Sequence, residues 1–334
     1  MTTAVGAPGR NRLECVDAAK GLAIALVVWG HIVARNPPGD AHWYELSKRL
    51  VYSFHMPFFM FLSGLVFFHA LKAPLAWPET LRAIGKRFYR LMPAYLLFGA
   101  LVVAGKLVAA RYVQVDNPVR TLGSALSVVL FPMSSPASFL WYVQTLFLLS
   151  ALVLVFVRAF GLRLWVLLAL AIPCHILQVT DFLALDRVAE LLLYFVIGGL
   201  VARYWADWTQ LTDLGLPLWL AAFAVALWWS SVDARAATAA ALLSIPALHG
   251  LVRLLPPGAS RRLQFLGLYA FPIYLMNTMA IGAGKAALAP FAAWSGRDFL
   301  FFYVPVLFAA GLFAPIFVKR WIFRRIPPLD RVTN

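Results

Sequence analysis

Long runs of apolar residues recur along the whole chain, and they constrain its fold more than any other feature. Runs of about 20 apolar residues are typical of membrane-spanning helices. The composition agrees, because 62% of the 334 residues are hydrophobic and 13% are charged, against about 50% and about 25% in soluble domains. The sequence predicts an all-α, polytopic integral membrane helical bundle of about ten transmembrane helices. We expect these helices at residues 21–35, 50–70, 92–110, 138–158, 162–178, 188–204, 215–231, 235–254, 264–283 and 299–319.

The distribution of basic residues indicates the orientation of the bundle. Most of the 29 lysines and arginines fall in segments that share one side of the membrane if the helices alternate in direction. Cytoplasmic loops are enriched in Lys and Arg, so we expect both termini in the cytoplasm. Residues 1–334 then form a single membrane domain with short cytoplasmic tails at 1–18 and 321–334. The same bias explains the net charge of +15 without nucleic acid binding.

Two processing and ligand signals are weak. Residues 1–36 carry basic residues before an apolar run, as a signal peptide does, but no small-residue cleavage site follows cleanly, and we expect a retained first helix. The two cysteines, Cys15 and Cys174, make neither a disulfide framework nor a metal cluster. We therefore expect no metal site.

The first helix combines an apolar run with polar side chains on one stripe. Lys20 and His31 are eleven positions apart, which is about three helical turns and about 16 Å along the axis. Asp17, one turn before Lys20, lies on nearly the same stripe. A titratable side chain at the depth of His31 is costly unless it faces a cavity or a partner. The alternatives are a functional site and a histidine that is hydrogen-bonded for packing alone.

The second helix and the segment after it extend this pattern. His55, in SFHMPFFMFLSG, is expected at a depth similar to that of His31 on an antiparallel neighbour, and Pro57 would free backbone groups to line a cavity. The following loop, RAIGKRFYRLMPAY, carries Arg82, Lys86 and Arg90 at four-residue spacing, with Arg87 three before Arg90, and on a short helix these make one cationic face. Such a face either marks topology alone or binds phosphate, whose geometry guanidinium groups match.

Several segments resemble one known family. RLECVDAAKGLAIALVVWGHI (residues 12–32) is similar to the first-helix signature of the acyltransferase-3 family of membrane O-acyltransferases, a basic residue followed after ten residues by histidine, here Lys20 and His31. SFHMPFFMFLSG (53–64) is similar to the second-helix pattern, and KRFYRLMPAY (86–95) to the basic motif. Weaker similarities lie at 139–147, 192–200 and 266–278. The resemblance covers most of the chain and is strongest to the fucose 4-O-acetylase-like, surface-polysaccharide branch.

Two positions depart from the family pattern. Lys20 stands where many members have arginine, which keeps the charge but loses the planar fork. Asn277 stands where relatives often have histidine, so the acceptor is expected to differ if that histidine handles it.

The resemblance implies an O-acyltransferase that moves an acyl group, expected to be acetyl, from an acyl-CoA such as acetyl-CoA to a carbohydrate hydroxyl. The acceptor would be a surface polysaccharide or a lipid-linked oligosaccharide. The protein would be a multi-pass protein of the bacterial inner membrane, in contact with membrane lipid and with polysaccharide biosynthesis proteins as partners. Acyl-CoA is a co-substrate in this scheme, and no permanently bound cofactor is expected.

The resemblance and the residue chemistry together assign roles. A neutral imidazole can take the proton of an alcohol as it attacks a thioester, and we assign this role to His31, with an acyl-imidazole as the alternative. Lys20 is expected to contact the donor or steady the thioester oxygen, and Asp17 to orient Lys20 or a water. The donor phosphates are expected to bind Arg87, Arg90 and Lys86, and the acceptor pocket to be lined by His55, Tyr274, Asn277, Trp141 and Gln144.

Two other classes of function remain open at the level of sequence. Ten helices with titratable residues suit a transporter of a lipid-linked sugar, or of a metabolite coupled to protons through His31 and Asp17. The two halves of the chain show no inverted repeat, which disfavours transport. A non-catalytic scaffold for polysaccharide assembly would need no buried polar stripe, and it ranks last.

Overall fold

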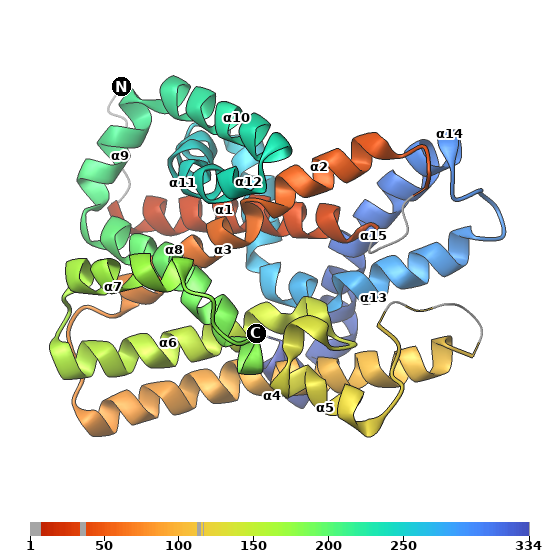
Figure 1. Cartoon of the computed structure of the whole chain (residues 1–334), viewed down its shortest axis with the longest axis horizontal. Coiled ribbons are helices and arrows are strands. Elements are labelled where there is room, and N and C mark those ends of the chain that lie inside the picture. The colour runs from red at the N-terminus through yellow and green to blue at the C-terminus, as the bar shows by residue number, and fades with distance from the viewer. Residues whose placement is uncertain (1–7, 34–37, 112–114, 116, 334) are drawn as a thin grey trace.

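The computed structural model describes residues 8–33, 38–111, 115 and 117–333, with side chains from residue 14, and these residues form helices joined by turns (Figure 1). The α-helices are α1 (Pro8–His31), α2 (His42–Tyr52), α3 (His55–Ala70), α4 (Trp77–Ala109), α5 (Leu122–Leu130), α6 (Trp141–Phe160), α7 (Leu164–Ile176), α8 (Leu185–Arg203), α9 (Trp205–Leu214), α10 (Leu216–Val232), α11 (Ala237–Arg253), α12 (Pro257–Leu268), α13 (Ala270–Leu288), α14 (Gly296–Asp298), α15 (Val304–Phe317) and α16 (Pro327–Val332).

The all-helical, multi-pass character that the sequence predicted is confirmed. Within the described ranges, five helical stretches are long and apolar enough to cross a membrane, at 42–70, 77–109, 138–160, 234–253 and 296–325. The pairs α9–α10 and α12–α13, bent by 78° and 76°, raise the number to seven if each pair is one span. The prediction of about ten also counted α1, α7 and α8. Of these, α7 has 13 residues, α1 carries charged residues as far as Lys20, and α8 carries them at both ends. The orientation of the termini stays a prediction.

Two helices begin earlier than the sequence predicted. The first helix runs from Pro8 to His31 instead of 21–35; residues 32 and 33 lie outside the helix, and 34–35 of the predicted range fall outside the described residues. The cationic segment expected in a loop forms the first turns of the 33-residue α4. Pro78 stands in the first turn, and the Glu79 carboxylate accepts a 3.1 Å hydrogen bond from the Ala76 amide, which satisfies a free amide at the start of the helix. The basic side chains therefore project from a continuous helix.

Glycines allow the central helices to approach closely. A Cβ atom at Gly64 of α3 would overlap the backbone of Phe195 in α8, and one at Gly198 of α8 would overlap the backbone of Phe61. Small residues at such crossings let helices pack through their backbones within a membrane. This contact fixes α3 against α8, and the first turns of both helices carry side chains that line one cavity, described below.

We expect Gly64→Ala to destabilise the protein. The added methyl group has to push α8 away, and overpacking of this kind costs about 1–3 kcal/mol. Thermal unfolding of the purified protein in detergent should show a lower midpoint. Gly85→Ala is the matched control, because no described atom lies within 4 Å of a Cβ at this position in α4. An equal midpoint for the two variants would contradict this view of the α3–α8 contact.

The end of the chain folds back onto the bundle. Lys319 is 5% exposed, and its ammonium donates to the Asp330 carboxylate and carbonyl at 2.8 Å and to the Thr333 hydroxyl at 3.0 Å. The described part of the predicted tail 321–334 is thus attached to the bundle. Figure 1 shows the C-terminus near the middle of the molecule.

Candidate active site

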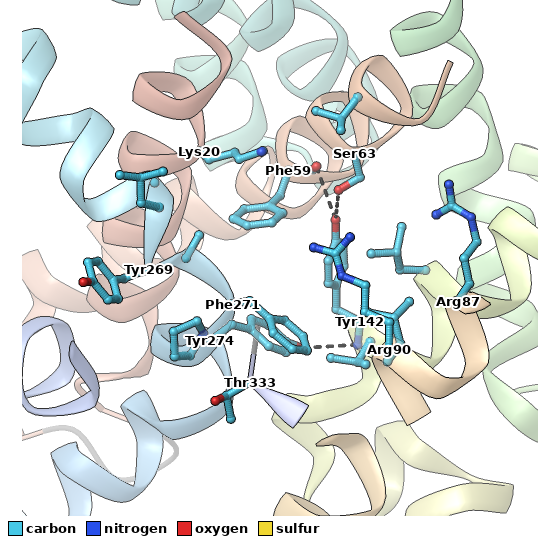
Figure 2. Close-up of a pocket in the computed structure, with 18 of the residues that line it drawn as sticks. Lys20, Phe59, Ser63, Arg87, Arg90, Tyr142, Tyr269, Phe271, Tyr274 and Thr333 are labelled. Atoms are coloured by element: carbon cyan, nitrogen blue, oxygen red, sulfur yellow. Dashed lines mark hydrogen bonds between the residues drawn. The ribbon is translucent and has the colours of Figure 1, made fainter. Parts of the chain in front are cut away.

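A cavity of about 890 Å³ brings together the charged residues predicted from the sequence. We call it the basic cavity, because Lys20, Lys86, Arg87 and Arg90 line it together with Asp17. In Figure 2, Lys20 lies at the upper left of the cavity, Arg87 lies at the right, and Arg90 overlaps Tyr142 in the middle of the view. Residues far apart in sequence thus present four cations to one space. Lys319, Arg324, Asp330 and Thr333 from the end of the chain line the same cavity.

The positions of the cations are fixed by local contacts. The Lys20 ammonium lies 3.2 Å from the Asp17 carboxylate, and both side chains are about 30% exposed, so neither charge is fully desolvated. The Arg87 guanidinium lies 4.4 Å from the centroid of the Phe67 ring, a cation–π distance. The close approach of Gly267 in α12 to the backbone of Asp17 forms part of the wall. Asp17 therefore forms an ion pair with Lys20, while Arg87 packs on an aromatic face, and the predicted role of Asp17 in orienting Lys20 or a water stays a prediction.

A second cavity, of about 300 Å³, contains the two predicted histidines. His31 at the end of α1 and His55 at the start of α3 both line it, as do Trp141 and Tyr274. We call it the histidine cavity. The sequence predicted that His31 and His55 share one depth, and the structure places them at one cavity. Its volume is at the lower end of the range for small-molecule sites.

Hydrogen bonds define the tautomer of His31. The Asn277 amide nitrogen donates to the carbonyl oxygens of Ile273 and Tyr274, at 2.9 and 2.8 Å, so the amide oxygen faces His31. That oxygen lies 2.7 Å from His31 Nδ1 and can only accept. Nδ1 of His31 therefore carries the proton, and Nε2 of the neutral ring keeps its lone pair. The ring is held in the state that a general base requires.

His55 is held in the same tautomer by a different partner. Its Nδ1 donates to the carbonyl of Val51 at 2.7 Å, and its ring stacks on Tyr52 with centroids 5.0 Å apart. Tyr52 in turn donates to the carbonyl of Gly30 at 2.8 Å. The end of α1 and the junction of α2 and α3 are thereby joined beside the two histidines.

Tyr274 lies at the junction of the two cavities and lines both. Its hydroxyl donates to the carbonyl of Phe139 and accepts from the Tyr142 amide at 3.2 Å. Figure 2 shows Tyr274 beside Tyr142, whose hydroxyl lies 2.8 Å from that of Ser63. The sequence placed Lys20 and His31 on one stripe of the first helix. In the structure, Lys20 lines the basic cavity and His31 lines the histidine cavity, and Tyr274 lies between the two residues.

Two residues predicted for the acceptor pocket are buried away from it. Asn277 is fully buried, and its amide is engaged by His31 and its own helix. Gln144 is 3% exposed and donates to the carbonyl of Val129 at 3.0 Å. Neither is among the described residues that line the two cavities. Of the two, Asn277 contacts a residue that lines the histidine cavity, His31.

Sequence reasoning missed several polar residues of the histidine cavity, namely His175, Arg187, Glu190 and Thr238. Charged residues within an apolar helix such as α8 are the signal that points to them. The described residues contain no group of three or more side chains arranged to hold a metal ion.

A membrane bundle with a basic cavity and an adjoining, oriented imidazole has the features of a group-transfer enzyme that uses a charged donor. The sequence profile of the family described as "Acyltransferase domain" matches residues 13–326, and the chain belongs to this family. It is therefore a multi-pass membrane protein of the acyltransferase family.

Two curated relatives are similar to about half of the chain. Nodulation protein NolL of Sinorhizobium fredii is 30% identical over 181 residues, which are 52% of this chain and 44% of that protein. Nodulation protein NolL of Mesorhizobium japonicum is 26% identical over 183 residues, 51% of this chain and 43% of that protein. The matched region spans less than half the length of either relative. No solved structure matches the chain.

Proposed function

We propose that the protein transfers an acetyl group from acetyl-CoA to a hydroxyl group of a carbohydrate. The observation that carries this proposal is the orientation of His31, whose Nδ1 contacts Asn277 and which lines a cavity that shares Tyr274 with the basic cavity. Family membership supplies the acyl transfer, and the resemblance to O-acetyltransferases of surface polysaccharides suggests the acceptor class. A transporter does not fit membership of an acyltransferase family.

The two cavities suggest a division of the substrates. The phosphates of the donor bind Lys86, Arg87 and Arg90, since charge-assisted bonds to phosphate are strong. The acyl thioester extends past Tyr274 toward His31, and the acceptor sugar occupies the histidine cavity. If the basic cavity faces the cytoplasm, as the charge bias predicts, the acceptor enters from the opposite side of the membrane.

The reaction follows from these positions. His31 Nε2 takes the proton of the acceptor hydroxyl while its oxygen attacks the thioester carbonyl carbon. The carbon–sulfur bond breaks, and the imidazolium returns the proton to the departing sulfur, which leaves as the CoA thiol. Lys20, at the wall of the basic cavity, stabilises negative charge on the donor. Asn277 keeps the imidazole in place throughout.

Purified protein in nanodiscs tests the proposal. Acetyl-CoA labelled in its acetyl group is supplied with a glycan extract or with simple glycosides, and both CoA release and label on the acceptor are measured. Acceptor-dependent CoA release with label on the sugar is the expected result. Label that stays on CoA with every carbohydrate acceptor would overturn the proposal.

We expect Asn277→Leu to reduce kcat by about 10- to 100-fold. This reduction is smaller than the one seen when the catalytic histidine of a serine protease is held in the wrong tautomer. The shape is nearly kept, but His31 Nδ1 loses its acceptor. The KM values for donor and acceptor should change little, because Asn277 lines neither described cavity. Thr278→Val is the matched control, since the buried Thr278 hydroxyl makes no hydrogen bond within the described part of the chain. Equal kcat in both variants would remove the positioning role.

A further inference from the structure

One wall of the histidine cavity is built from charged and polar side chains that the reaction above does not use. Arg187 and Glu190, one turn apart on α8, lie there with Trp141 of α6. Arg187 Nη1 donates to the Glu190 carboxylate at 2.5 Å, and its guanidinium lies 5.9 Å from the centre of the Trp141 ring. Both charged side chains line the cavity, and they are 34% and 40% exposed.

The neighbours of this wall hold it in one arrangement. His175 Nδ1 donates to the Glu190 carbonyl at 2.8 Å, and His175 Nε2 lies 3.2 Å from the Thr238 hydroxyl, which donates to it. The turn before α8 places Leu183 and Ala184 at φ 54° and φ 60°, in the left-handed region that side chains rarely adopt. Polar groups fixed around a small space are suited to recognise one ligand shape.

The chemistry of the wall matches a sugar ring. A carboxylate with one oxygen bound by Arg187 keeps acceptor capacity for hydroxyl groups, and a guanidinium supplies donors in a fixed plane. Trp141 offers an apolar face for the C–H side of the ring. A charged pair at this depth is costly without a partner or a polar cavity. An apolar or purely lipid acceptor would offer this ion pair no further hydrogen bond.

We propose that Arg187, Glu190 and Trp141 form the subsite that binds the acceptor sugar and select its hydroxyl pattern. The inference rests on the proposed function for its choice of ligand. Glu190 accepts hydrogen bonds from adjacent hydroxyls, Arg187 donates to ring or glycosidic oxygens, and Trp141 stacks on the ring. The hydroxyl that faces His31 across the cavity is the one that reacts.

Binding and transfer are measured separately to test this. Saturation-transfer NMR reports the binding of methyl α-L-fucoside, methyl β-D-glucoside and methyl β-D-galactoside to the protein in nanodiscs without donor. We expect wild type to bind at least one of them, and Glu190→Gln and Trp141→Ala each to weaken that binding by about tenfold or more. Acetyl-CoA binding should be unchanged in both variants.

Asp186→Asn is the matched control. The Asp186 carboxylate also lies 3.1 Å from Arg187, but Asp186 does not line the described cavity. If the ion pairs of Arg187 only stabilise α8, Asp186→Asn and Glu190→Gln will behave alike. If Glu190 contacts the sugar, only Glu190→Gln will lose glycoside binding, and Arg187→Lys will keep the charge yet bind more weakly.

The outcomes separate this inference from the proposed function. Equal glycoside binding by wild type and Glu190→Gln, or no binding of any of the three glycosides by wild type, overturns the subsite. Binding that depends on Glu190, with no acetyl transfer by wild type, retains the subsite and removes the proposed reaction.

Discussion

Substitution of His31 by alanine is expected to lower the rate of acceptor acetylation by about 100- to 10,000-fold, the range that a positioned general base contributes. The loss should appear in kcat, because His31 lies in the histidine cavity, away from the cations of the basic cavity. Donor affinity should therefore stay near that of wild type. Transfer of labelled acetyl to the acceptor, measured in membranes at matched expression, gives the rate.

His42→Ala provides the matched control for this experiment. His42 is exposed at the start of α2 and is not among the described residues of either cavity. Acetylation should be unchanged in this variant. Full acetylation in His31→Ala, at equal expression, would remove His31 from the reaction whether it acts as a base or through an acyl-imidazole.

The double variant Arg87→Ala, Arg90→Ala is expected to raise the KM for acetyl-CoA by about 100-fold. Each guanidinium can contribute a charge-assisted hydrogen bond to phosphate, and one such bond corresponds to about tenfold in affinity. The kcat at saturating donor should change little, because the reacting groups lie past Tyr274. Initial rates at increasing acetyl-CoA, with a fixed acceptor concentration, provide the measurement.

Arg82→Ala is the control for general loss of positive charge. Arg82 lies on the same helix, α4, but does not line the basic cavity as described. A KM that rises equally in Arg82→Ala and in the double variant would show that this helix acts through net charge or topology alone. The double variant should also become less sensitive to salt than wild type, since screening weakens exposed charge contacts.

The helical architecture was predictable because apolar length and helix formation are local properties. The points at which a predicted helix bends or is divided in two were harder to predict. The expected helix at 264–283 is two helices bent by 76° at Tyr269, and this bend aims Tyr274 and Asn277 of α13 into the site. Pro272 gives no hydrogen bond to the Leu268 carbonyl and crowds it, which favours a break at this point. Gly267, beside the break, also lets α12 pack against the backbone of Asp17. Periodicity in one sequence does not report such packing.

The site was predictable where charge and periodicity act within one helix. The stripe of Asp17, Lys20 and His31 required only helical geometry, and the pairing of Asp17 with Lys20 follows from their spacing. The contact between His31 and Asn277 joins residues 246 positions apart, so no local pattern encodes it. The sequence named Asn277 for the acceptor pocket, but its burial reveals a supporting position behind the imidazole. Arg187 and Glu190 are charged residues in an apolar helix, but the sequence did not lead to their prediction as site residues.

The folded end of the chain also affects how the protein should be handled in the laboratory. Thr333 and Asp330 lie at the wall of the basic cavity, held there by Lys319. An affinity handle or fluorescent fusion joined to the last residue would be tethered at that wall. Labels for purification are better inserted in a turn that does not line this cavity, such as the one at Gly161 between α6 and α7.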